Sequence, residues 1–75
     1  MQELGHFPYR VMRAIESLGD MATGRNIHHK LEEELKMKIN PGQMYVTLDK
    51  LAGPKYIEAR ELLSPIRFKV TSDGQ

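Results

Sequence analysis

The chain of 75 residues contains no cysteine and no tryptophan, and its aromatic residues are three tyrosines and two phenylalanines. Without cysteine, neither a disulfide nor a thiolate metal ligand can hold the fold together. A single domain of this length buries only about 60% of the surface that its unfolded chain exposes. Stability must therefore come from packing of helices and strands or from a partner subunit, and a homodimer is one way to supply it.

Long apolar runs are also missing. No segment approaches the roughly 18 consecutive apolar residues of a membrane span, and the first residues lack the basic start and apolar core of a secretion signal. We therefore expect no membrane association and a cytoplasmic location. Hydrophobic residues make up 40% of the chain and charged residues 28%, which is typical of a globular domain. The net charge of +1 neither suggests nor excludes nucleic acid, because the distribution of charge over the surface decides that.

Two apolar repeats with helical spacing occupy the first half of the chain. The first consists of Phe7, Val11, Ile15 and Leu18. We expect Pro8 in the first turn of this helix and Gly19 at its C-terminal end. The second repeat consists of Ile27, Leu31 and Leu35, and Thr23 is expected as its N-cap.

A third helix is predicted from Pro41 to about Ala52. Asn40 is a favoured N-cap, Pro41 suits the first helical position, and Gln43 stands where a capping-box side chain reaches back. The apolar side consists of Met44, Leu48 and Leu51. The Gly53-Pro54 pair should end this helix, since proline lacks the donor that a continuing helix needs.

The last third of the chain predicts two strands. Residues 56–62 alternate weakly between apolar and polar, and residues 66–71 alternate cleanly, with Ile66, Phe68 and Val70 on one face. The short segment 63–65 can connect the strands as a hairpin. Three helices followed by a hairpin predict one domain over residues 1–75 in the mainly helical α+β class, a winged helix-turn-helix. In that fold the third helix enters the DNA major groove and the hairpin lies beside it as a wing.

Four segments resemble the PadR-like family of transcriptional regulators. They are TGRNIHHKLEEEL, PGQMYVTLDKL (with Met44 in place of the leucine of a Pro-Gly-x-Leu-Tyr signature), YIEA and IRFKVTSDG. The resemblance extends from about residue 7 to residue 75, with Lys55 where the family usually has glycine. It implies a winged-helix repressor that binds double-stranded DNA as a homodimer.

In that family the dimer forms through helices that follow the wing, and a pocket between them often senses small aromatic or toxic compounds. The present sequence ends at Gln75 without such helices. We therefore expect either a minimal member of that family or a homodimer that uses other surfaces, and no small-molecule effector.

Affinity for DNA comes chiefly from phosphate contacts, and sequence selection from side chains that reach base edges. The candidates for base edges are Gln43, Val46, Thr47 and Lys50. The candidates for phosphates are Arg25, His28 and His29 near the start of the second helix and Arg60, Arg67 and Lys69 on the wing, with Tyr45 added by the resemblance. Structural alternatives remain: Gln43 as a cap partner, Tyr45 as a partly buried aromatic, and Arg67 with Lys69 as a solvated strand face.

Other functions have weaker support in the sequence. His28 with Glu32, or His29 with Glu33, has helical spacing for a divalent ion, but two ligands do not make a site, and we expect no metal or cofactor. Glu32 and Glu33 are expected to project into solvent. No Gly-rich phosphate loop or serine with a positioned base indicates an enzyme. The main alternative is a winged helix that binds protein, favoured by the near-neutral charge and by Leu62-Leu63 at the hairpin tip.

Overall fold

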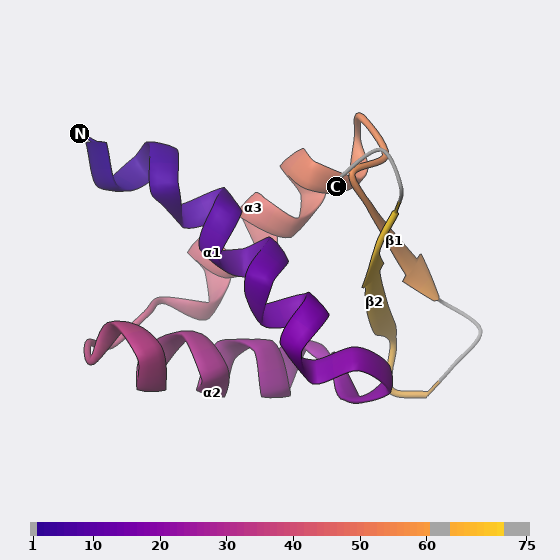
Figure 1. Ribbon diagram of the computed structural model, residues 1–75, viewed down its shortest axis with the longest axis horizontal. Helices are drawn as coiled ribbons and strands as arrows, with labels where there is room; N and C mark the ends of the chain where they lie inside the picture. Colours follow the sequence, from indigo (N-terminus) through magenta and orange to yellow (C-terminus); the bar gives the residue numbers. More distant parts are fainter. Residues whose placement is uncertain (1, 61–63, 72–75) are drawn as a thin grey trace.

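The computed structural model describes residues 2–60 and 64–71 and has a winged-helix-like α+β layout (Figure 1). The elements in chain order are α1 (Gln2–Leu18), the 3-10 turn η1 (Gly19–Met21), α2 (Gly24–Leu35), α3 (Pro41–Ala52), β1 (Ile57–Arg60) and β2 (Arg67–Val70). The predicted order of three helices and a hairpin is confirmed. The expected hairpin tip at Leu62 and Leu63 lies outside the described residues.

The start of α1 differs from the prediction. The helix begins at Gln2, so Pro8 lies in its interior instead of in its first turn. Proline has no backbone N–H, so α1 lacks one hydrogen bond at this point, and the helix continues through the gap. The C-terminal end is as expected, because Gly19 has a φ of +57°, a left-handed conformation that favours glycine.

Both predicted N-caps are present. The Oγ1 atom of Thr23 accepts a hydrogen bond of 3.1 Å from the N–H of Asn26. The Oδ1 atom of Asn40 accepts one of 2.7 Å from the N–H of Gly42. Each cap satisfies a donor that the first turn of a helix leaves free, and so fixes where the helix begins.

The core lies where the three helices and the hairpin meet. It consists of Val11, Ala14, Ile15, Ala22, Ile27, Leu31, Ile39, Met44, Leu48, Leu51, Ile57 and Val70, with Phe7, Met12, Leu18, Leu35 and Phe68 partly buried around it. The apolar repeats of all three predicted helices therefore face this core. Burial of one such side chain contributes about 1.5–3 kcal/mol.

The two strands form an antiparallel pair in the register Ile57↔Val70, Glu58↔Lys69, Ala59↔Phe68 and Arg60↔Arg67. On its other edge β2 contacts the segment before α2: the N–H of Phe68 donates to the carbonyl of Ala22 at 2.9 Å, and Thr23 pairs with Arg67. The alternation predicted Ile66 on one buried strand face with Phe68 and Val70. That prediction is wrong, because Ile66 precedes β2 and is 43% exposed.

Two side chains of α2 hold the turn that leads into α3. The N–H of Ile39 donates to Oε2 of Glu32 at 2.9 Å, and the carbonyl of Ile39 accepts from Nε2 of His28 at 2.6 Å. The expectation that Glu32 projects into solvent is therefore wrong. Its carboxylate fixes the backbone of the turn, and with it the position from which α3 starts.

Candidate nucleic-acid interface

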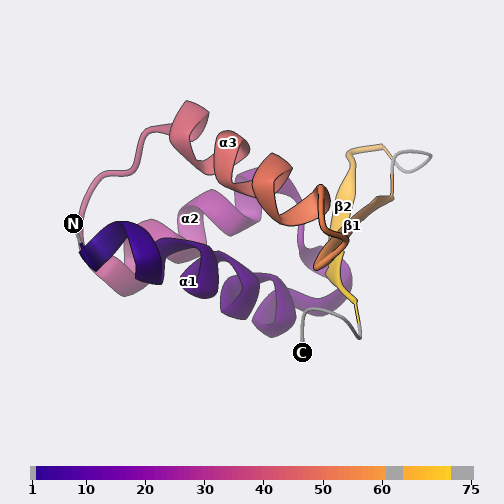
Figure 2. The ribbon, with the colours of Figure 1, turned by 90° about the horizontal axis from the view of Figure 1, so that it is seen from above.

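The outer side of α3 is bare. Its exposed residues are Pro41, Gly42, Gln43, Tyr45, Val46, Asp49, Lys50 and Ala52. Figure 2 shows α3 on one side of the molecule and α1 on the opposite side, and the end of the hairpin where β1 stops and β2 starts points to the same side as α3. One flat or cylindrical partner could therefore contact α3 and the wing together.

Thr47 does not belong to this outer side. It is buried, with 8% of its surface exposed, and its Oγ1 atom donates a 3.0 Å hydrogen bond to the carbonyl of Gln43. A threonine that bonds to the preceding turn of its own helix has its hydroxyl turned away from any groove-bound partner. We therefore withdraw Thr47 from the candidates for base edges.

Gln43 lies at the start of α3 with its carboxamide free. The capping function that its position suggested is carried by Asn40 alone, through Gly42. Within residues 2–60 and 64–71, the side chain of Gln43 makes no hydrogen bond. Gln43 and Lys50 are both exposed, and they remain candidates for contact with a partner.

Tyr45 lies across the first residue of α2. A Cβ atom added to Gly24 would come within 3.0 Å of the Cζ atom of the Tyr45 ring and would overlap its hydroxyl. Only glycine therefore lets the ring lie there, with 49% of Tyr45 still exposed. The ring of Tyr45 is thus packed and still accessible, so a role as a partly buried aromatic and a role in phosphate contact are compatible.

The start of α2 gathers groups that suit an anion. The N–H groups of Gly24 and Arg25 have no hydrogen-bond partner in the part of the chain that the structure describes, whereas the next two N–H groups are bonded to Thr23. Free amides and the helix dipole favour negative charge at such an end. The exposed side chain of Arg25 and the hydroxyl of Tyr45 lie at the same end, and Arg67 is paired with Thr23 beside it.

The wing carries two arginines in facing positions of its strands. Arg60 and Arg67 are directly opposite each other, and like charges in this arrangement destabilise a hairpin. Lys69, two residues further on, lies opposite Glu58 in the strand register. The Nε atom of Arg67 is buried and has no hydrogen-bond partner among the described residues. A bound anion could accept hydrogen bonds from either guanidinium group.

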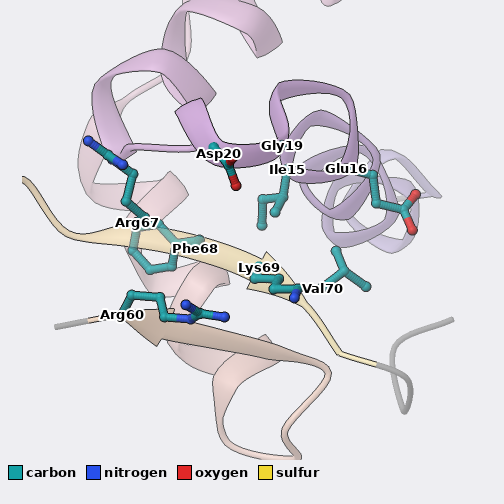
Figure 3. Close-up of a pocket in the computed structure, with 9 residues that line it drawn as sticks. All are labelled: Ile15, Glu16, Gly19, Asp20, Arg60, Arg67, Phe68, Lys69 and Val70. Carbon is teal, nitrogen blue, oxygen red and sulfur yellow. The ribbon is translucent and has the colours of Figure 1, made fainter. Parts of the chain in front are cut away.

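The three wing cations also line a groove between the sheet, the end of α1 and η1 (Figure 3). Glu16 and Asp20 lie on its other wall, and Phe68 lies between Arg60 and Arg67. Among the described residues, none of the three cations is within 4.0 Å of a carboxylate oxygen. The groove is therefore of mixed charge, with the cations on the hairpin.

The two histidines of α2 have different surroundings. His28 is bonded to Ile39 and its Nε2 atom is 3.4 Å from Oε2 of Glu32, so its ring is occupied in holding the turn, and we withdraw it from the phosphate candidates. His29 is exposed. No group of three or more metal-binding side chains occurs in residues 2–60 and 64–71, and none of the helices described there is long and apolar enough to cross a membrane.

The structure thus brings Arg25, Tyr45 and Arg67 around the start of α2 and leaves Gln43, Val46 and Lys50 on the bare side of α3. Sequence reasoning missed Gly24, whose lack of a side chain gives Tyr45 its place. No local pattern signals that contact, because it joins two helices.

No protein-family model matches the chain, and no curated protein or solved structure is significantly similar to it. The architecture itself defines the class: a winged-helix-like domain with an exposed third helix and a basic hairpin.

Proposed function

We propose that this chain is a sequence-specific regulator of transcription that binds double-stranded DNA, a repressor of the PadR-like type. In this proposal α3 enters the major groove and the hairpin lies on the phosphate backbone. The observation that supports it most is the bare outer side of α3, with the end of the hairpin where β1 stops and β2 starts on the same side of the molecule (Figure 2).

The proposal is supported because different residues can contact base edges and phosphates. Gln43, Val46 and Lys50 are exposed on α3 and can reach base edges, which is how sequence is selected. The cations Arg25, His29, Arg60, Arg67 and Lys69, together with Tyr45, can contact phosphates on either side of the groove. The proposal assigns the protein a binding function and no catalysis.

A single copy should bind weakly. Lys50 is the only cation on α3, Asp49 is exposed beside it, and the net charge of the chain is +1. Two copies on adjacent half-sites would double the number of phosphate contacts and give useful affinity. We therefore propose a homodimer that represses by occupying its site and excluding polymerase.

The test is selection of bound duplexes from a randomised DNA library, followed by gel shifts on the selected sequence. Gln43→Ala and Lys50→Ala should each weaken binding by about tenfold, the order of magnitude of one base or phosphate contact. Lys30→Ala is the matched control, because Lys30 is 3.6 Å from Glu34 on α2 and outside the proposed interface. Failure to enrich any sequence would contradict the proposal.

A second candidate function is a winged helix that binds another protein. The observation in its favour is the exposure of apolar side chains on α3 and the wing: Val46 is 53% exposed, Tyr45 49% and Ile66 43%. A protein-binding module would show no affinity for duplexes even at low salt. It would keep its partner in Gln43→Ala and Lys50→Ala and lose it in Ile66→Asp.

A further inference from the structure

Val46 lies at the centre of the outer side of α3. It is 53% exposed, and Gly42, one turn before it on nearly the same line of the helix, has no side chain. The helix can therefore approach the floor of a groove closely along this line. The only apolar group that the major groove offers to a valine is the C5 methyl of thymine.

Gln43 lies one turn before Val46 on the same exposed side. Its carboxamide has no hydrogen-bond partner among the described residues, so both its donor and its acceptor are available. Adenine presents a donor and an acceptor side by side, N6–H and N7, and a glutamine pairs with both at once.

Guanine has no matching partner in the first half of α3. Guanine presents two acceptors, O6 and N7, which arginine recognises best, and α3 contains no arginine. Asp49, one turn after Val46, is exposed and can only accept hydrogen bonds, so in the second half of α3 it suits a donor such as N4–H of cytosine. Lys50 is the single cation of the helix and lies one turn after Val46, in the second half of α3, where it can donate to guanine or to a phosphate.

We infer that the first half of α3 reads A·T base pairs, with Val46 against a thymine methyl group and Gln43 against the major-groove edge of an adenine. The inference rests on the proposed function and specifies its target. It makes Val46 and Gln43 the specificity-determining residues, and it places A·T pairs under the first half of α3.

The experiment uses the full chain and the duplex obtained by selection, altered one atom group at a time. Replacing the contacted thymine by deoxyuridine removes only the methyl group and should weaken binding about fourfold, the effect of one buried methyl. In Val46→Ala, most of the affinity difference between the thymine and deoxyuridine duplexes should disappear. Replacing the contacted adenine by 7-deazaadenine removes N7 and should weaken binding about tenfold in the wild type but not in Gln43→Ala.

The outcomes distinguish the reading of A·T pairs from the proposed DNA binding itself. A selected site whose helix-contacted positions are G·C pairs, or a deoxyuridine series without effect at any position, overturns the reading of A·T pairs and leaves DNA binding intact. Binding without any enriched sequence overturns both. Lys30→Ala is the control, since Lys30 lies beside Glu34 on α2 outside the proposed interface and its removal should leave the ratio between natural and altered duplexes unchanged.

Discussion

At the scale of single residues, Gly24 and Tyr45 depend on each other. A methyl group at position 24 would overlap the Tyr45 hydroxyl, so Gly24→Ala should displace the ring without disturbing the core. Alanine also has a better helix propensity than glycine, so the free energy of unfolding should change by less than about 1 kcal/mol. If Tyr45 contacts a phosphate, DNA affinity should nevertheless fall about fivefold to tenfold in a gel shift.

The matched variant for this test is Tyr45→Phe, which keeps the ring and removes the hydroxyl. It should show a similar loss of affinity with an unchanged melting temperature. Wild-type affinity in both variants would show that the ring of Tyr45 is placed for packing alone.

Two lysines occupy backbone conformations that suit glycine. Lys36 has a φ of +55° at the end of α2, and Lys55 a φ of +66° just before β1. A side chain in this region costs about 1–2 kcal/mol, partly offset by the greater freedom of glycine in the unfolded chain. We therefore expect Lys36→Gly and Lys55→Gly each to stabilise the fold by about 0.5–1 kcal/mol in urea unfolding.

Lys38→Gly is the control for these variants, because Lys38 is exposed and is not in the left-handed region. That substitution should be neutral or destabilising. If Lys36→Gly or Lys55→Gly behaves in the same way as Lys38→Gly, the left-handed backbone at that position carries no strain that glycine relieves.

At the scale of helices, the turn between α2 and α3 gives the stability a dependence on pH. The hydrogen bond from the N–H of Ile39 holds the pKa of Glu32 below its ordinary value of 4.5, helped by the nearby charges of His28, Lys38 and His29 and opposed by partial desolvation. A lowered pKa in the folded state stabilises the fold above the unfolded value. That contribution is lost as the pH falls below 4.5 and passes through the folded value.

In Glu32→Gln, the free energy of unfolding should therefore fall less steeply as the pH falls below 4.5. Urea unfolding at a series of pH values measures this. Glu33→Gln removes the same charge from an exposed neighbour that does not bond to Ile39, and it should leave that dependence on pH in place. An acid-side slope that is the same in Glu32→Gln and in the wild type would contradict a role for this carboxylate.

Sequence reasoning succeeded at this scale where the signals are local. Thr23, Asn40 and Gly19 mark helix ends through contacts with residues at most three positions away, and apolar spacing identified the buried sides of all three helices. It failed where distant segments meet. The bond between Glu32 and Ile39 depends on how the chain turns back, which no periodic pattern encodes.

The candidate site was predictable to a similar extent. The exposure of Gln43, Val46 and Lys50 follows from helical phase. Thr47 was misplaced because it lies at the boundary between the two sides of α3, and packing decided its orientation. The opposition of Arg60 and Arg67 required the register of the hairpin, which alternation of apolar and polar residues alone does not fix.

At the scale of the whole molecule, the proposed interface should respond to salt. Each phosphate contact releases a counterion, so the logarithm of the binding constant falls linearly with the logarithm of salt concentration. Arg60→Ala or Arg67→Ala should reduce the magnitude of this slope by about 1 per protein copy. The loss of affinity should be similar on every duplex sequence. Lys30→Ala should leave the slope unchanged, because Lys30 pairs with Glu34.

The same titration tests the homodimer when it is combined with light scattering. A duplex with two half-sites spaced by one helical turn should bind two copies with a slope about twice that of a single half-site. One copy per duplex, with equal slopes on both substrates, would contradict the dimer and leave binding by a single domain. Since the phosphate candidates of one copy surround only α3, its wing and the start of α2, the second copy must supply any further contacts from its own half-site.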